Sequence, residues 1–149
     1  MQTNHQFILG DARNLDSIAD EQVQLVVTSP PYPMIAMWDE VFREMSPEAG
    51  KALDQEAGLE AFEAMHIELD RIWQECFRVL SPGGFACINI GDATRTIGGD
   101  FRLFHNHARI LTAMSQIGFQ VLPDILWRKP TNAPNKFMGS GMLPAGAYV

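Results

Sequence analysis

The stretch Gln24-Leu25-Val26-Val27-Thr28-Ser29-Pro30-Pro31-Tyr32 decides both the fold and the place of the site. Its first five residues form an apolar, β-branched run, which predicts a buried strand. Pro30 and Pro31 lack the backbone N–H that a central strand donates, so the strand must stop before them. In open α/β sheets, ligands bind beyond the carboxyl ends of the strands. The sharp turn from Ser29 to Tyr32 is therefore where we expect chemistry.

Outward from this strand, apolar runs alternate with helical patterns. Apolar residues recur at steps of three and four from Leu59 to Leu80, which is the stripe of an amphipathic helix. A second helix is expected over residues 101–117, with Gly118 as its C-terminal cap. The other expected strands are Phe7–Leu9, Phe85–Ile90 and, with a bulge or an edge position at its proline, 119–127. This alternation predicts an α/β domain with a mainly parallel sheet.

The length of 149 residues suits one domain with a single core. Residues 33–58 are polar and broken by proline and glycine, so we expect a partly helical excursion over the end of the strand. Residues 128–149 show no periodicity and are expected to form a flexible loop or tail. We therefore interpret residues 1–149 as part of one domain.

Composition narrows the class of protein. No apolar run approaches the roughly 20 residues that span a bilayer. The N-terminus lacks the pattern of a signal peptide, so the cytoplasm is the expected compartment. The two cysteines, Cys76 and Cys87, are then expected to be reduced, buried thiols, neither a disulfide nor a metal site.

The net charge of −7 argues at first against nucleic acid as a partner. The charge is unevenly distributed, however, because the chain from Asp100 onward carries a balance of +3 and the first 99 residues carry −10. An acidic helix facing solvent and a basic tail facing a ligand are compatible with an enzyme that acts on nucleic acid. Charge alone does not decide the question.

Chemistry of one kind suits the segment Ser29-Pro30-Pro31-Tyr32. The exocyclic amine of a nucleobase is a poor nucleophile, since its lone pair is delocalised into the ring. The Ser29 hydroxyl and the Pro30 carbonyl could accept both amine hydrogens and direct the lone pair at an incoming methyl group, while Tyr32 stacks on a flipped-out base. Two alternatives are a turn that merely ends the strand and a polyproline ligand for a partner. The buried strand leading into the segment disfavours the second.

The segment resembles the catalytic motif, (D/N/S)-P-P-(Y/F/W), of the DNA amino-methyltransferases. Leu80-Ser81-Pro82-Gly83-Gly84-Phe85 and the stretch from Ile125 to Asn132 resemble two later units of the same family. The resemblance implies a Rossmann-like fold, S-adenosylmethionine as methyl donor, DNA as substrate and a place in restriction–modification. Within it, Ser29, Pro30, Pro31 and Tyr32 are catalytic. Serine in the first motif position is similar to the enzymes that methylate N4 of cytosine, and N6 of adenine is the alternative.

The resemblance also assigns a cofactor set. Gly10-Asp11-Ala12 resembles the strand-end motif that binds the cofactor's adenine, and Thr28 joins Gly10, Asp11 and Ala12 as a candidate. Several family members place the catalytic motif first and the glycine-rich methionine-binding motif last. Phe137-Met138-Gly139-Ser140-Gly141 matches that motif in letters, but neither a strand precedes it nor a helix follows it. We therefore expect that the true methionine-binding motif is missing and that the fold is incomplete, truncated before that motif. The chain alone is then expected to be inactive.

The remaining candidates concern DNA and metal. Arg128, Lys129, Asn132 and Lys136 are expected to contact DNA, and no metal site is expected. His105 and His107 should point to different faces of a helix, and Asp92 either borders the pocket or caps the following loop. A rival interpretation of the whole chain is a non-catalytic remnant that binds nucleic acid or a partner. The oligomeric state is left open by the sequence.

Overall fold

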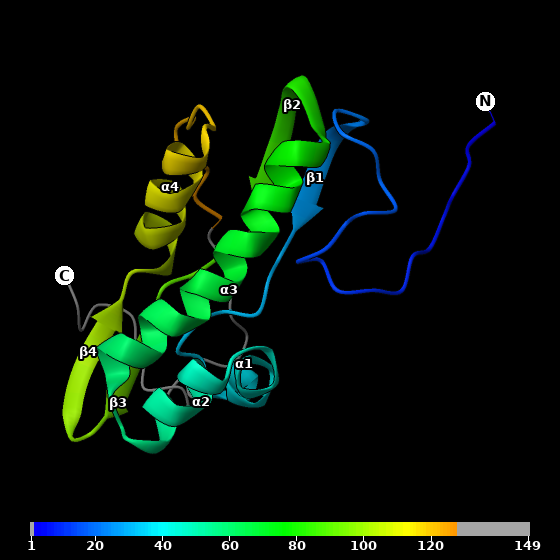
Figure 1. Cartoon of the computed structure of the whole chain (residues 1–149). Coiled ribbons are helices and arrows are strands. Elements are labelled where there is room, and N and C mark those ends of the chain that lie inside the picture. The colour runs from blue at the N-terminus through cyan, green and yellow to red at the C-terminus, as the bar shows by residue number, and fades with distance from the viewer. Residues whose placement is uncertain (1, 128–149) are drawn as a thin grey trace.

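The computed structural model describes residues 2–127, and Figure 1 shows their arrangement. The elements run in the order β1 (Val23–Thr28), the 3-10 helix η1 (Ala36–Trp38), α1 (Asp39–Met45), α2 (Pro47–Asp54), α3 (Gly58–Val79), β2 (Leu80–Ile88), β3 (Ala93–Ile97), β4 (Asp100–Phe104) and α4 (Asn106–Ile117). β1 and β2 form one two-stranded sheet, and β3 and β4 form another. The predicted combination of helices with a parallel pair of strands is confirmed.

β1 and β2 are parallel, because the long helix α3 carries the chain back between them. The register pairs Leu25 with Phe85 and Thr28 with Ile88, and shifts between Val23 and Leu25. The shift accommodates Ser81-Pro82-Gly83-Gly84, which lies inside β2, so the strand expected at Phe85–Ile90 begins earlier, at Leu80. Gly83 has a φ of +81°, a left-handed value that glycine adopts without a steric penalty.

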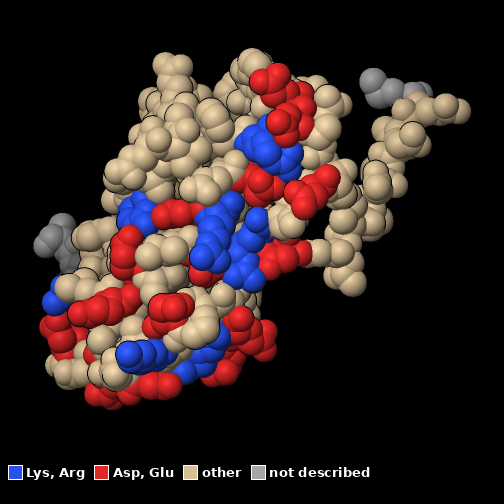
Figure 2. Space-filling model, viewed as in Figure 1, with Lys and Arg blue, Asp and Glu red and all other residues tan. Residues whose placement is uncertain are grey.

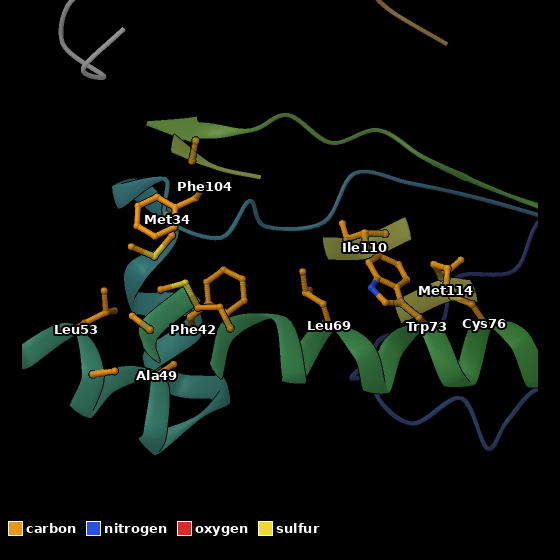
Figure 3. Packing of buried hydrophobic residues seen from close by; sticks show 14 residues of the cluster. Met34, Phe42, Ala49, Leu53, Leu69, Trp73, Cys76, Phe104, Ile110 and Met114 are labelled. Atoms are coloured by element: carbon orange, nitrogen blue, oxygen red, sulfur yellow. The ribbon is translucent and has the colours of Figure 1, made fainter. Parts of the chain in front are cut away.

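The core follows one side of α3 for its whole length (Figure 3). At 1.5 Å per residue a helix of 22 residues is about 33 Å long, so different parts of α3 can pack against different elements of the fold. Trp73, Leu69 and Met65 of α3 are 0% exposed. They pack in one cluster with residues from α1, α2, the hairpin and α4, including Phe42, Leu53, Phe104 and Ile110.

Residues 33–58 are partly helical, as expected. Pro47 stands at the first position of α2, and the Ser46 hydroxyl accepts from the Ala49 N–H over 3.2 Å, which caps the helix. α1 is tied to the β3–β4 hairpin by Arg95, whose guanidinium donates twice to the Asp39 carboxylate over 2.7 Å. Both side chains are mostly buried, so this two-pronged pair fixes the excursion against the hairpin.

The helix expected over residues 101–117 was wrong at its start. Residues 100–104 form β4, and the helix begins at Asn106. Gly98 and Gly99 have φ values of +59° and +77°, which two-residue hairpin turns of type I′ require. A Gly-Gly pair between two alternating runs is itself a hairpin signal, so this hairpin could have been predicted from the sequence. Gly118 does end α4, with a φ of +124°.

Three other expectations were wrong. Phe7–Leu9 and residues 119–127 are not strands, and each lacks a neighbouring strand to pair with among the described residues. Leu9 and Ile125 are almost fully exposed. Cys76 is buried as expected, but Cys87 is exposed, because alternation along β2 turns it away from the helix-covered face.

Candidate functional site

The candidate catalytic loop, residues 29–33, leaves the carboxyl end of β1 and lies beside the carboxyl end of β2. The strand pairing continues one step past the strands, because the Asn89 N–H donates to the Thr28 carbonyl over 2.9 Å. Pro30 and Pro33 are buried, whereas Ser29 is exposed. The loop is thus anchored through two prolines and leaves its hydroxyl accessible.

A tight turn ends the loop. The Ile35 N–H donates to the Tyr32 carbonyl over 3.2 Å. Pro33 occupies the second position, and Met34, in the third, has a φ of +66°. This is the pattern of a type II turn, whose third position glycine normally fills. A left-handed non-glycine residue costs about 1–3 kcal/mol. The Met34 side chain, 1% exposed in the core, holds the turn in that conformation.

Tyr32 is half-buried and contacts both strand ends. Its hydroxyl oxygen lies 3.4 Å from the Ser29 Oγ and accepts from the Asn89 side-chain amide over 3.3 Å. Gly91 faces the ring, since a Cβ at that position would lie 3.4 Å from Tyr32 Cε2. The loop after β1 and the loop after β2 therefore meet at this tyrosine.

Asn106, the first residue of α4, is 0% exposed and joins the two loops from behind. Its side-chain amide donates to the Pro33 carbonyl over 3.1 Å and to the Gly91 carbonyl over 3.0 Å. Its Oδ1 lies 3.0 Å from His66 Nε2. One buried amide thus satisfies two loop carbonyls and one histidine.

The buried ring of His66 completes this network. Because both amide hydrogens of Asn106 go to carbonyls, its oxygen is the acceptor and His66 Nε2 must carry the proton. Nδ1 has no hydrogen-bond partner within residues 2–127. Burial lowers the pKa of His66 to about 4, although the hydrogen bond to Asn106 opposes the shift. The histidine is neutral at physiological pH.

Asp92, also after β2, contacts the first turn of α4, which is neither of the two roles that the sequence suggested. Its carboxylate accepts from the His107 N–H over 3.2 Å and lies 2.8 Å from His107 Nδ1. The other oxygen lies 3.4 Å from His105 Nδ1, so the two histidines share a partner and the expectation of different faces was wrong. Burial would raise the pKa of Asp92, but the His107 hydrogen bonds outweigh it and the pKa is lowered.

The cofactor candidates are less firmly placed. Both oxygens of Asp11 accept from the Arg13 side chain at 2.6–3.1 Å, and the Arg13 backbone N–H adds a bond of 2.9 Å. These hydrogen bonds lower the pKa of Asp11. Arg13 in turn pairs with Glu68 of α3 over 2.7 Å. Gly10 and Ala12 are exposed, and nothing lies within 4 Å of a Cβ placed at Gly10.

A carboxylate has about four acceptor positions, and Arg13 makes four contacts to Asp11, so a donor from a ligand would have to replace part of this pair. Asp11 is half exposed, which suits a ribose or an adenine approaching from solvent. Thr28 ends β1 directly before the catalytic loop and is half-buried. The assignment of these residues to a cofactor site stays a prediction. The described part of the chain supplies no glycine-rich loop between a strand and a helix.

Three residues of the site were missed by the sequence analysis. Asn89 could have been found, because it follows an apolar strand just as Ser29 does, at the same edge of a parallel sheet. Asn106 and His66 gave no such signal. A lone asparagine before a helix and a lone histidine on an apolar stripe are ordinary capping and core residues until the tertiary fold brings them together.

The DNA-contact candidates Arg128, Lys129, Asn132 and Lys136 lie outside the described residues. Two arginines of the chain from Asp100 onward already form ion pairs. Arg102 pairs with Asp100, and Arg109 pairs with Glu63 and Asp70, each at 2.7 Å. Figure 2 shows the same intermixing of basic and acidic side chains over the face drawn there.

Residues 2–127 contain neither a candidate metal site nor a candidate membrane span. No group of three or more His, Cys, Asp or Glu side chains in that range is placed to hold a metal ion. None of the helices described is long and apolar enough to cross a membrane.

A proline loop at the carboxyl end of a parallel strand, braced by the end of the next strand, defines an α/β protein with a strand-end site. The profile of the DNA methylases matches residues 23–142, and the chain belongs to this family. The matched residues contain the whole candidate loop, both strands of the parallel sheet (β1 and β2) and α3. The resemblance drawn from Ser29-Pro30-Pro31-Tyr32 is thereby confirmed.

Two curated relatives match almost the whole chain. It is 53% identical to the type II methyltransferase M.MjaI of Methanocaldococcus jannaschii, over 99% of this chain and 52% of that protein. It is 49% identical to the type II methyltransferase M.MthZI of Methanothermobacter thermautotrophicus, over 100% of this chain and 42% of that protein. The chain therefore spans about half the length of these relatives.

The fold has a similar counterpart among solved structures. A putative DNA modification methylase from Thermus thermophilus, crystallised in complex with S-adenosyl-L-methionine, is 30% identical, with a TM-score of 0.58. The likeness covers 86% of this chain and 59% of that one. The small parallel sheet with its helices is thus part of a Rossmann-like methyltransferase fold.

Proposed function

We propose that this chain is the catalytic part of a DNA methyltransferase that transfers a methyl group from S-adenosylmethionine to N4 of cytosine. The observation that supports amine methylation is the geometry of the loop: exposed Ser29 and half-buried Tyr32 lie together at the carboxyl end of β1, braced by Asn89. The choice of N4 of cytosine rests on serine in the first position of the motif. The bound ligand of the Thermus thermophilus methylase supports the choice of donor.

Each residue then has a defined task. The target amine is held by the Ser29 hydroxyl oxygen and the Pro30 carbonyl, and the flipped base stacks on Tyr32. The two prolines keep the carbonyl fixed, so little reorganisation is needed when the amine becomes positively charged during transfer. S-adenosylmethionine supplies the electrophilic methyl group, and Asp11 with Gly10, Ala12 and Thr28 would hold one end of it.

A hybrid protein tests the function. Residues 1–149 replace the matched region of the Methanocaldococcus jannaschii relative, and the hybrid is incubated with S-adenosylmethionine and unmethylated DNA. Digestion to nucleosides and mass spectrometry should show N4-methylcytosine. N6-methyladenine in its place would refute the cytosine assignment, and 5-methylcytosine would refute amine methylation altogether, because ring-carbon transfer needs a thiolate nucleophile.

Variants of the hybrid test the role of the ring. Tyr32→Ala should lower the rate roughly 5- to 150-fold, since base–aromatic stacking is worth about 1–3 kcal/mol. Tyr32→Phe keeps the ring and should cost less, because the hydroxyl contacts of 3.3 and 3.4 Å are long and weak. Equal losses in the two variants would assign the role to the hydroxyl. Residues 1–149 alone should transfer methyl groups slowly or not at all.

A further inference from the structure

The side chain of Asn106 is hydrogen-bonded to the backbone on both sides of the Tyr32 ring. One amide hydrogen goes to the carbonyl of Pro33, the residue that directly follows Tyr32, over 3.1 Å. The other goes over 3.0 Å to the carbonyl of Gly91, where a Cβ would lie 3.4 Å from Tyr32 Cε2. The amide therefore links the segment that carries the ring to the segment against which the ring packs.

The amide of Asn106 is itself held in place from α3. Its oxygen, Oδ1, accepts from Nε2 of His66 over 3.0 Å, and both side chains are 0% exposed. Phe62, one turn earlier in α3, packs edge-on against the histidine ring, with the ring centroids 4.5 Å apart. An N–H donor facing Oδ1 fixes which end of the amide is oxygen and which is nitrogen. His66 thus sets the orientation in which Asn106 donates to both loops.

Stability alone is a weak reason for these two side chains. The Nδ1 atom of His66 has no hydrogen-bond partner within residues 2–127, and an unpaired buried polar atom is unfavourable. Asn106 does not cap α4 either, because both of its amide hydrogens go to carbonyls outside the helix. What the pair accomplishes is to connect α3 and α4 to the two loops that enclose the Tyr32 ring.

We propose that Asn106 and His66 are positioning residues for methyl transfer, which hold the Tyr32 ring at the distance and angle at which it stacks on the target base. Neither side chain touches substrate, because both are fully buried. A misplacement of about 1 Å at a reacting site can cost roughly 100-fold in rate, so the pair acts on the transfer step and not on cofactor affinity. The inference rests on the proposed role of Tyr32 and does not depend on which base is methylated.

A matched pair of variants at His66 tests the positioning role and leaves the Asn106 amide in place. The side-chain nitrogen of glutamine reaches the position of histidine Nε2, whereas that of asparagine reaches only the position of Nδ1. His66→Gln should therefore keep the hydrogen bond to Asn106, and His66→Asn should lose it, although both replace the ring by an amide. Asn106→Ala is the less suitable test, because it leaves two buried carbonyls unpaired and can unfold the chain.

The position of the ring can be followed without any methyl transfer. Residues 1–149 labelled with 3-fluorotyrosine give two fluorine NMR signals, one for each tyrosine of the chain, and Tyr32→Phe assigns them. The Tyr32 signal should shift or broaden in His66→Asn and stay close to that of the parent chain in His66→Gln. Circular dichroism first checks that both variants are folded. Identical Tyr32 signals in the two folded variants would overturn the proposal.

The rate is measured in the hybrid with the Methanocaldococcus jannaschii relative. His66→Asn should lower kcat roughly 10- to 100-fold and leave KM for S-adenosylmethionine within about twofold, while His66→Gln should recover most of the rate. Met114→Ala is the control for stability, because Met114 is 6% exposed and lies in α4 about 12 Å from Asn106. It loosens the packing of the same helix and should leave kcat nearly unchanged at a temperature where the variant is folded.

Two kinetic outcomes would contradict the proposal. If Met114→Ala lowers kcat as much as His66→Asn at equal stability, the pair has a structural role only. If His66→Asn changes KM for S-adenosylmethionine and not kcat, the pair acts on the cofactor and not on Tyr32. A hybrid that transfers no methyl group would instead refute the proposed function, and the fluorine signals would still decide whether the pair positions the ring.

Discussion

Two segments were predicted as strand-end motifs, and the structure treats them differently. Residues 29–34 are fixed by groups from β2, α3 and α4, including the buried amide of Asn106 and the core side chain of Met34. Residues 7–12 lie along the surface, held at one end through Arg13. The candidate catalytic loop is thus held by several elements of the described structure, whereas the segment proposed to bind the cofactor takes little support from them.

The largest expected effect falls on the fixed segment. Asn106→Ala leaves two carbonyls and the His66 N–H unpaired in the interior, and each such group costs about 1–3 kcal/mol. The free energy of unfolding, measured with urea, should fall by about 4 kcal/mol. Asn89→Ala, which removes an exposed amide at the same loop, is the control and should cost less than about 1 kcal/mol. Similar losses in the two variants would show that the buried network contributes nothing special.

The pH dependence sharpens the same point. The pKa of His66 is about 4 in the folded chain and about 6.5 when unfolded, so between these values only the unfolded state takes up the proton. Stability from this group is complete above pH 6.5 and is lost as the pH falls to 4, by about 3 kcal/mol in total.

His66→Gln keeps the N–H donor towards Asn106 but does not titrate. The difference in unfolding free energy between pH 7 and pH 4 should therefore be about 3 kcal/mol smaller in this variant, by urea titration at each pH. Both proteins share Asp11 and Glu75, whose pKa values are lowered by hydrogen bonds to arginines and not by His66, so these carboxylates cancel in the comparison. An unchanged pH profile would mean that His66 takes up its proton as readily in the folded chain as in the unfolded chain.

A smaller effect tests the turn. Met34→Ala and Met34→Gly remove the same core side chain, a loss of roughly 2–5 kcal/mol for either. Glycine is ordinarily the worse replacement, but at a φ of +66° it relieves strain. We expect Met34→Gly to be more stable than Met34→Ala by about 1 kcal/mol, measured by thermal and urea unfolding. The reverse order would contradict the type II turn.

The smallest effect is expected in the segment that carries Asp11. Its carboxylate is half exposed and pairs only with Arg13 two residues away. Exposed pairs contribute about 0–1 kcal/mol, so Asp11→Asn should change the free energy of unfolding by less than about 1 kcal/mol. The same variant in the hybrid should weaken S-adenosylmethionine binding, which calorimetry measures. A large loss of stability in the isolated chain would place Asp11 in the folding core, not in a cofactor site.

Features that depend on neighbouring residues could be predicted from the sequence, whereas features that depend on contacts between distant residues could not. The strand before Ser29 and the α3 stripe are encoded by runs of neighbouring residues, and both were predicted. That strand is not fully buried as expected, because Leu25 and Val27 are exposed, and the turn expected from Ser29 to Tyr32 lies at residues 32–35. The strands at Phe7–Leu9 and 119–127 failed, because an apolar run becomes a strand only if a partner is present to pair with it, and the described residues offer none. The hairpin turn at Gly98-Gly99 was not predicted, although a Gly-Gly pair is a local hairpin signal. Asn106 and His66 could not be predicted, because their contact joins residues 40 positions apart in the chain.

The pairing of β1 with β2 has a kinetic consequence. Tyr32 and Asn89, which meet at the loop, are 57 residues apart in the chain, and contacts of such separation slow folding. A ribosome adding about 5–20 residues per second needs several seconds after making β1 before β2 exists. During that interval the run from Leu25 to Thr28 is an unpaired apolar strand, the kind of segment that chaperones bind. Newly made chain should therefore be most prone to aggregate before residue 88 has left the ribosome.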